Sequence, residues 1–144
     1  MYCHLHLKNS TVYMPTMGKM DKGFYRGVEP VAVVAASNTQ ALRQALAETI
    51  ARGNPRVPML RRREWPQPVV LKYAKVKTWS AFERGALLWS IEEKSGCFQI
   101  TGQRKQPDGM WKDDSGQTVT FPAGTAVDDV IDRMIVILQE AARS

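Results

Sequence analysis

The chain has 144 residues, of which 44% are hydrophobic and 24% charged, and its formal net charge is +6. This composition is typical of a globular protein and argues against an intrinsically disordered chain. The length fits a single domain over residues 1–144. No stretch approaches the roughly 18 apolar residues that a membrane span needs. Residues 1–8 lack the basic and then apolar order of a secretory signal. We therefore expect a cytoplasmic protein that does not contact a membrane.

The N-terminal residues predict an antiparallel pair of strands. Residues 2–8 alternate in character, with Cys3, Leu5 and Leu7 on one face and Tyr2, His4, His6 and Lys8 on the other. A turn at Asn9-Ser10 separates this strand from a partner over residues 11–14. A loop is expected from Pro15 to Gly23. The apolar run over residues 31–35 predicts a short strand that is buried on both faces.

Two amphipathic helices are predicted, one near the middle and one at the end of the chain. The first covers residues 38–52, with Ser37 and Gln40 at capping-box spacing and Gly53 at its C-terminal end. The second starts near the pair Thr125 and Asp128, which are spaced as a cap. Its apolar stripe is formed by Val127, Val130, Ile131, Met134, Ile135 and Leu138.

The residues between the two helices predict a loop, four strands and a short helix. Residues 53–67 contain three prolines, with Pro68 just beyond, and predict an exposed loop. Residues 69–73 are predicted as a strand, and Ser80 and Glu83 as the capped start of a short helix. Three strands in a meander then follow, turning at residues 93–96, 107–109 and 113–116. This order favours an α+β fold in which a mainly antiparallel sheet carries the two amphipathic helices on one face.

The two histidines of the chain lie on the same face of the first strand. His4 and His6 are about 7 Å apart by strand rise. Two imidazoles can begin a zinc or copper site, but no third ligand is indicated, and exposure on the wet face of the strand is the simpler interpretation. Cys3 and Cys97 lack a zinc-type spacing. We predict no metal and no cofactor.

No catalytic pattern is recognisable. The chain lacks a Gly-x-Ser-x-Gly elbow, a GxGxxG sequence and a Walker sequence. The acidic pairs Glu92-Glu93, Asp113-Asp114 and Asp128-Asp129 are explained by solvation and helix capping, because adjacent strand residues face opposite ways. We expect a binding protein that is not an enzyme.

Charge is distributed unevenly along the chain. Residues 52–77 hold eight basic residues against one acid, a local net charge of +7. Residues 108–144 hold seven acids against three bases, a local net charge of −4. The first segment contains the sequence Arg61-Arg62-Arg63-Glu64-Trp65, to which Arg104 and Lys105 add if the hairpin folds nearby. Arginine and tryptophan in this pattern bind proteins or nucleic acids, and they also occur in a solvated loop whose tryptophan packs on the core.

The second half of the chain contains the segments VKTWSAFERGALLWSIEE, PDGMW and PAGTAVDDVIDRMIVILQ. These segments resemble those of small proteobacterial immunity proteins of contact-dependent growth inhibition systems. The resemblance implies a non-catalytic cytoplasmic protein that neutralises a toxin domain delivered by a neighbouring cell. No residue role follows from it. The alternative is a basic nucleic-acid-binding module that uses Arg61–Arg63 and Trp65.

The charge pattern leaves two docking arrangements open for a toxin partner. Opposite potentials speed association and disfavour wrong partners. Either the acidic turns at Asp108 and Asp113-Asp114 meet a basic toxin, or the arginine loop meets an acidic one. The candidate partner-binding residues are therefore Arg61, Arg62, Arg63, Trp65, Arg104, Lys105, Asp108, Asp113 and Asp114.

Overall fold

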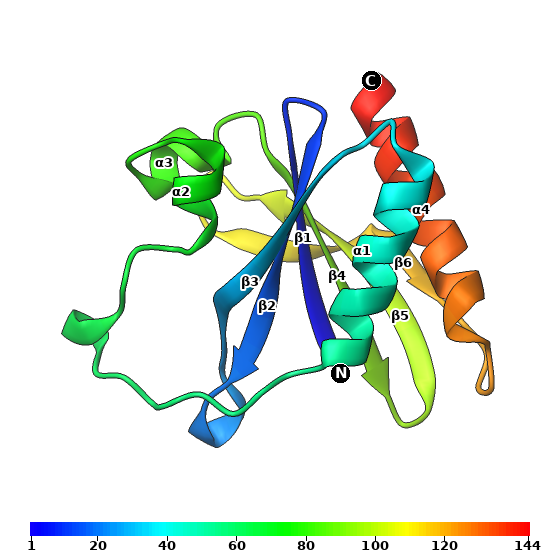
Figure 1. Ribbon diagram of the computed structural model, residues 1–144, viewed down its shortest axis with the longest axis horizontal. Helices are drawn as coiled ribbons and strands as arrows, with labels where there is room; N and C mark the ends of the chain where they lie inside the picture. The colour runs from blue at the N-terminus through cyan, green and yellow to red at the C-terminus, as the bar shows by residue number, and fades with distance from the viewer.

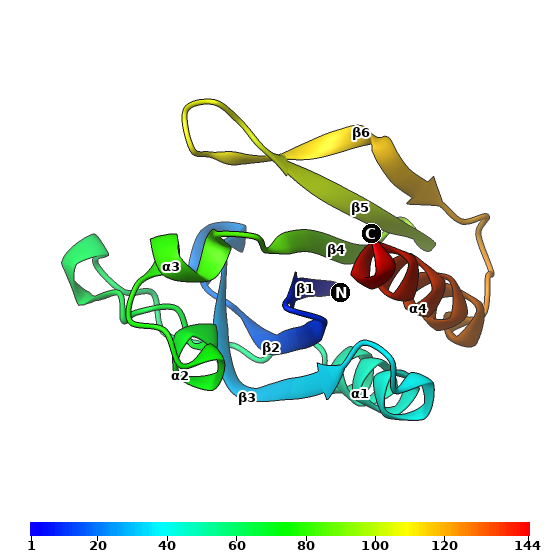
Figure 2. The ribbon, with the colours of Figure 1, turned by 90° about the horizontal axis from the view of Figure 1, so that it is seen from above.

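The computed structural model describes residues 1–144 and is built around one six-stranded antiparallel sheet. Its order is β3-β2-β1-β4-β5-β6, so β1 and β4 are central and β3 and β6 are the edges (Figures 1 and 2). The strands are β1 (Tyr2–Lys8), β2 (Thr11–Lys19), β3 (Tyr25–Ala35), β4 (Leu87–Lys94), β5 (Cys97–Lys105) and β6 (Trp111–Thr120). The predicted α+β class with a mainly antiparallel sheet is confirmed.

The helices divide between the two faces of the sheet. The long helices α1 (Thr39–Arg52) and α4 (Val127–Arg143) pack side by side on one face, as predicted. The short helices α2 (Val70–Ala74) and α3 (Trp79–Glu83) lie at the other face, which we call the second face. Two 3-10 turns, η1 (Asp21–Gly23) and η2 (Arg62–Glu64), complete the elements. No helix is long and apolar enough to cross a membrane.

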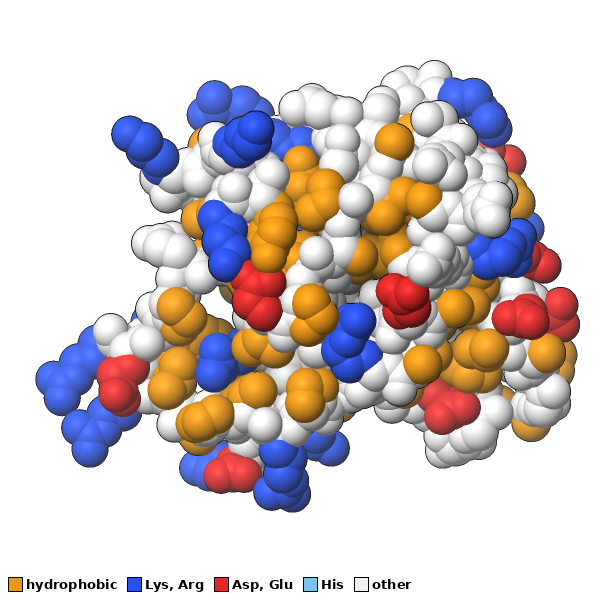
Figure 3. All heavy atoms as spheres, viewed as in Figure 1, with side chains coloured by type: hydrophobic (Ala, Val, Ile, Leu, Met, Phe, Trp, Pro, Cys, Tyr) orange, Lys and Arg blue, Asp and Glu red, His pale blue; other side chains and the backbone are white.

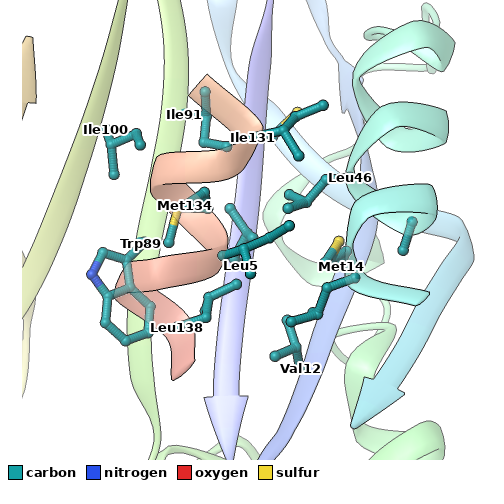
Figure 4. Packing of buried hydrophobic residues seen from close by; sticks show 14 of the residues in the cluster. Leu5, Val12, Met14, Leu46, Trp89, Ile91, Ile100, Ile131, Met134 and Leu138 are labelled. Carbon is teal, nitrogen blue, oxygen red and sulfur yellow. The ribbon is translucent and has the colours of Figure 1, made fainter. Parts of the chain in front are cut away.

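The main hydrophobic core lies between the sheet and the two long helices. β1 contributes Cys3, Leu5 and Leu7, the face that the sequence alternation predicts. Figure 4 shows the apolar stripe of α4 meeting the side chains of β1, β2 and β4. Leu138 of α4 is 0% exposed, and each fully buried aliphatic side chain of this kind contributes about 1.5–3 kcal/mol of transfer free energy.

Residues 69–73 are not the strand that the sequence predicts, because most of this run belongs to the helix α2. The backbone N–H of Leu71 donates to the carbonyl of Pro68 and so starts the helical turn. Val70 and Leu71 are both buried and pack with Tyr13 and Phe82 in a small second-face cluster. A five-residue apolar run does not distinguish helix from strand by periodicity, and here the tertiary contacts determine the outcome.

The predicted loop from Pro15 to Gly23 is also wrong. β2 continues to Lys19, and a register shift between Pro15 and Thr16 accommodates the missing N–H of the proline. The run over residues 31–35 belongs to the longer edge strand β3, where Val33 is 44% exposed rather than buried on both faces. Asp113 and Asp114 lie within β6 rather than in a turn.

Helix capping follows the predicted positions only approximately. Asn38 caps α1 by accepting from the N–H of Ala41, in place of Ser37. Thr78 caps α3 in the same way, in place of Ser80. Thr125 does not cap α4, because its hydroxyl donates to the carbonyl of Pro122. Gly53 ends α1 with a positive φ of 69°, as expected.

Truncation of Leu138 tests the main core. Leu138→Ala leaves a cavity between α4 and the sheet, so we expect it to lower the free energy of unfolding by about 2–5 kcal/mol. The matched control is Val136→Ala on the same helix, where the side chain is 46% exposed. Urea unfolding measures both variants, and equal losses would contradict the packing of α4 described above.

Candidate functional site

The segment between α1 and α2, residues 53–69, crosses the second face of the sheet, and we call it the strap. Figure 1 shows it leaving the end of α1, extending outward to η2 and returning to α2. Its side chains are exposed over most of residues 58–68. The strap corresponds to the predicted exposed loop. One proline, Pro58, lies shortly before η2, and two more, Pro66 and Pro68, lie between η2 and α2.

The first end of the strap is fixed by one asparagine and by a short parallel pairing with β2. The Asn54 amide accepts from the backbone N–H of Tyr2 at 2.9 Å and donates to the carbonyls of Tyr2 and Met17, each at 2.8 Å. Lys19 then exchanges backbone hydrogen bonds with the strap, donating to Pro55 at 2.8 Å and accepting from Val57 at 3.1 Å. These bonds fill the gap between β1 and β2, whose own pairing extends only from Lys8 and Thr11 to His6 and Tyr13.

Two glycines let the strap lie close to the sheet. A Cβ at Gly18 would come within 2.6 Å of a methyl group of Val57, closer than real Cβ contacts allow. A Cβ at Gly27 would meet Pro15 and Val69 at 3.3 Å. The strap therefore touches the sheet at Val57 and at Val69. Between these contacts it spans an open space.

That space is a cavity of about 510 Å³, which we call the second-face hollow. The residues that line it include Tyr2 and His4 of β1, Tyr25 and Arg26 of β3, and Trp65 of the strap. A smaller hollow of about 300 Å³ adjoins it, shares His4 as a lining residue and reaches His6. The two volumes fall within the range of ligand sites in proteins.

A row of rings runs along the floor. Tyr25 stacks on Tyr2 with ring centroids 4.8 Å apart, and Tyr2 lies 5.9 Å from His4. The imidazoles of His4 and His6 are 4.8 Å apart, and His6 meets Phe82 edge to face at 5.4 Å. The shared face of the two histidines is confirmed, but the expected exposure is wrong for His6, which is only 4% exposed, while His4 is half-buried.

Three nitrogen atoms of residues that line the two hollows are buried and have no hydrogen-bond partner in the chain. They are His4 Nε2, His6 Nδ1 and Arg26 Nε. Burial lowers the pKa of His4 to about 4, an effect that the charge of Asp113 partly opposes. Burial and the neighbouring His4 hold the pKa of His6 well below its usual range. Both imidazoles are therefore neutral at pH 7. No group of three or more His, Cys, Asp or Glu side chains is placed to hold a metal ion.

The strap presents the predicted arginines to solvent. Arg61, Arg62 and Arg63 are exposed and none of them has an ion-pair partner. The carboxylate of Glu64 caps η2 by accepting from the backbone N–H of Arg61. Trp65 is 46% exposed although its indole N–H donates to the carbonyl of Leu60. In Figure 3 basic side chains form the outer edge of this region, with hydrophobic side chains between them and the body of the protein.

The other predicted site residues lie on the β5–β6 hairpin and are bonded to one another or to neighbours. Arg104 pairs with Asp114 at 3.3 Å, and Lys105 pairs with Glu83 at 2.9 Å. Hydrogen bonds from Gln117 and from the N–H of Gly116, with Arg104 nearby, lower the pKa of Asp114. No hydrogen bond or ion pair joins this hairpin to the strap, and the two are separate in both views (Figures 1 and 2).

The remaining acids of the hairpin also have local roles. Asp108 accepts from the backbone N–H of Met110 and closes the turn. Asp113 accepts from the side chain of Gln103 at 3.4 Å. The structure therefore brings Arg104 and Asp114 together, but it does not join Arg104 and Lys105 to the arginine loop.

Sequence reasoning missed the floor of the hollow. The alternation over residues 2–8 placed Tyr2, His4 and His6 on one face, but it gave no sign that another segment covers that face. Arg26 was not singled out, because it lies in a stretch that was read as following a loop. The glycines at 18 and 27 were the available signal, since glycine in a strand often marks the close approach of another backbone.

Comparisons with known proteins show the fold of the chain. No family model matches it, and neither does any curated protein. A solved structure of a protein of unknown function from Neisseria meningitidis is similar with a TM-score of 0.63 and 11% identity, covering 98% of this chain and 92% of that one.

A chain of the CdiA-CT/CdiI toxin and immunity complex from Yersinia pseudotuberculosis is similar to the same degree. Its TM-score is 0.63 at 9% identity, and the match covers 98% of this chain and 95% of that one. The predicted resemblance to proteins of contact-dependent growth inhibition thus has a counterpart in the fold.

The close approach of the strap can be tested at Gly18. Gly18→Ala forces a methyl group against Val57, and we expect a loss of about 1–3 kcal/mol in the free energy of unfolding. Val57→Ala removes the two methyl groups that obstruct it. The double variant should therefore be more stable than the sum of the two single changes predicts. Additive losses in urea unfolding would show that the strap does not touch the sheet at this point.

The buried histidines predict a loss of stability in mild acid. Well above pH 6.5, which is the pKa of a histidine in the unfolded chain, both are neutral in the folded and the unfolded chain. As the pH falls toward 4, the unfolded chain binds protons at these sites and the folded chain does not, so the free energy of unfolding decreases. For His4 alone the decrease is of the order of 3 kcal/mol, since its pKa falls from 6.5 to about 4.

Urea unfolding between pH 7 and pH 4.5 measures this decrease. The groups that face the pair are Tyr2, Trp79 and Phe82, with Asp113 supplying the nearby negative charge. The variant His4→Gln/His6→Phe should lose the pH dependence in this window. Glu83 and Asp114 do not account for the decrease, because their lowered carboxyl pKa values affect stability only below about pH 4.5. If the variant keeps the same dependence of unfolding free energy on pH, groups other than the two histidines cause it.

Proposed function

We propose that this chain is an immunity protein that binds and neutralises a toxin domain of a contact-dependent growth inhibition system. The observation that carries the proposal is the match of nearly the whole fold to a chain of the Yersinia pseudotuberculosis toxin and immunity complex. The three sequence segments that resemble such immunity proteins support it independently. The proposed role is binding without catalysis, in the cytoplasm where a delivered toxin acts.

The strap is the proposed toxin-binding surface. Its three arginines have no partner within the chain and lie beside the half-exposed Trp65. Arginine and tryptophan dominate the binding energy of protein interfaces, because each combines a large contact area with directed hydrogen bonds. The proposal therefore pairs this surface with an acidic face of the toxin.

The acidic residues of the hairpin fit this role less well. The carboxylates of Asp108, Asp113 and Asp114 each accept a hydrogen bond from within the hairpin, and Arg104 neutralises Asp114. A toxin that docked there would first have to displace these bonds. Of the two docking arrangements that the sequence left open, we favour the one in which the arginine loop meets an acidic partner.

Co-expression with the toxin domain encoded beside this gene tests the proposal. We expect the two proteins to co-purify and the chain to protect cells against that toxin. The variant Arg61→Gln/Arg62→Gln/Arg63→Gln should weaken binding at least about tenfold, mainly through slower association, and should reduce its dependence on salt. Biolayer interferometry at several salt concentrations measures both rates.

The matched control removes three exposed cations elsewhere, in the variant Lys112→Gln/Arg133→Gln/Arg143→Gln. It lowers the net charge equally and should leave the affinity unchanged. Equal effects of the two variants would locate the interaction in the overall charge and not in the strap. Failure to co-purify or to protect would reject the immunity role. Salt-sensitive binding of mixed RNA or DNA that the strap variant abolishes would favour the nucleic-acid alternative.

A further inference from the structure

The strand β3 lies at one edge of the sheet, so the backbone groups on its outer side have no strand partner. Its residues 31–35 are all apolar and contain no charged side chain. Figure 3 looks onto this strand in the view of Figure 1 and shows hydrophobic side chains and backbone over its upper part, with charged side chains near its lower end. An open edge of this kind is a template for pairing with another strand.

The register with β2 determines which backbone groups of β3 point outward. In an antiparallel pair, residues that exchange backbone hydrogen bonds with the partner strand alternate with residues that do not. Pro15, which has no N–H, stands opposite Val31, and the N–H of Ala36 donates to the carbonyl of Ser10 at 2.9 Å. The bonds with β2 therefore belong to the even-numbered residues from 32 to 36. The odd-numbered residues from 31 to 35 direct their backbone groups to the free edge.

Some of these outward groups already have partners within the chain. The carboxylate of Glu29 accepts from the N–H of Val31, and the carbonyl of Ala35 accepts from the N–H of Asn38 at 3.0 Å. The groups left without a partner are the N–H and the carbonyl of Val33, the carbonyl of Val31 and the N–H of Ala35. The free edge thus holds both donors and acceptors, and all of them lie within residues 31–35.

These free groups complement themselves about a two-fold axis at Val33. When two copies of β3 lie antiparallel with Val33 opposite Val33, each Val33 N–H meets the Val33 carbonyl of the other copy. The same register sets Ala35 opposite Val31, so the free N–H of Ala35 meets the free carbonyl of Val31. The groups that Glu29 and Asn38 already occupy would face each other in this register, so no bond within the chain has to break.

We propose that β3 pairs with β3 of a second copy of this chain and joins the two sheets into one continuous sheet across a two-fold axis at Val33. The side chain of Val33 is 44% exposed in the single chain, and the pairing covers it with the same residue of the second copy. The register brings no two charges together, since Glu29 lies across from Ser37. A contact that uses the same surface on both copies closes on itself and yields a dimer.

The other edge strand, β6, does not offer the same surface. It carries Lys112, Asp113 and Asp114 in succession, and Asp114 pairs with Arg104. Charged side chains along an edge oppose pairing with another chain, because like charges placed opposite each other destabilise a sheet. Self-association is therefore expected at β3 and not at β6.

Sedimentation velocity from micromolar to millimolar concentration tests the pairing. We expect the average mass to rise toward that of two chains as the concentration increases. Val33→Lys sets two like charges opposite each other at the axis and should raise the dissociation constant at least about tenfold. Val33→Thr keeps the branched shape without a charge and should still dimerise.

The matched control is Val136→Lys on α4. Val136 is 46% exposed, close to the exposure of Val33, so the control adds the same charge at a comparable side chain away from β3. It should leave the dissociation constant unchanged. Urea unfolding of each variant checks that it remains folded.

Hydrogen exchange of the backbone amides is a second readout and needs no substitution. The N–H groups of Val33 and Ala35 should exchange rapidly in dilute solution and slowly in concentrated solution, because only the second copy protects them. Those of Ala32 and Val34 should exchange slowly in both, because they are bonded to β2.

The remaining outcomes overturn the proposal. They are a chain that stays monomeric at every concentration, and an association that Val33→Lys weakens no more than Val136→Lys does. Concentration-dependent protection of other amides without that of Val33 and Ala35 would place the contact on another surface. Both measurements use this chain alone, so their failure leaves the immunity proposal standing, and failure of co-purification with a toxin leaves the dimer standing.

Discussion

The central strand β1 is covered on both faces, although only one of them is apolar. Cys3, Leu5 and Leu7 pack beneath α1 and α4 as any core strand would. The opposite side chains include Tyr2, His4 and His6, which carry polar atoms into a covered region. The row of rings and the buried nitrogen atoms of the second face both follow from placing polar side chains on a covered strand face. Aromatic rings tolerate such burial because they offer a large apolar surface, whereas their polar atoms still require partners.

The strap reconciles this face with the rest of the chain only in part. The side chain of Asn54 and the backbone of Pro55 and Val57 make hydrogen bonds to the ends of β1 and β2. Helix α2, which follows it, closes the small cluster around Phe82. The middle of the strap makes no hydrogen bond to His4 or Arg26, so His4 Nε2 and Arg26 Nε remain buried without partners. Unsatisfied groups of this kind lower the stability of the free protein and are a common property of sites that are completed by a partner.

The fold class was predictable from the sequence because the buried residues of the main core recur at strand or helix spacing. The stripe of α4 and the alternation of β1 each identify a buried face without knowledge of the other, and both were confirmed. The run at residues 69–73 failed because its five residues fit helix and strand alike, and contacts with Tyr13 and Phe82 decide between them. The predicted helix starts were wrong for a similar reason, because Asn38 and Thr78 can cap a helix as well as the predicted Ser37 and Ser80.

The candidate site was predictable only where it depends on composition. Three adjacent arginines and a tryptophan between prolines identify an exposed surface from sequence alone, and the structure places them in solvent. The hollow instead requires Tyr2, Arg26 and Trp65 to line the same space, although these residues lie far apart in the sequence. Local patterns contain no information about such a meeting until the topology is known.

The division between the two faces also bears on how widely the sequence of this fold can vary. The compared structures share nearly the whole fold at 11% identity or less. The main core needs only apolar residues of suitable size, and such residues can be exchanged widely if volume and pattern are kept. The strap and the floor beneath it contribute little to that core, so their residues can vary without loss of the sheet. The exposed residues Arg61–Arg63 and Trp65 can therefore be exchanged while the helices and the opposite face of β1 stay as they are.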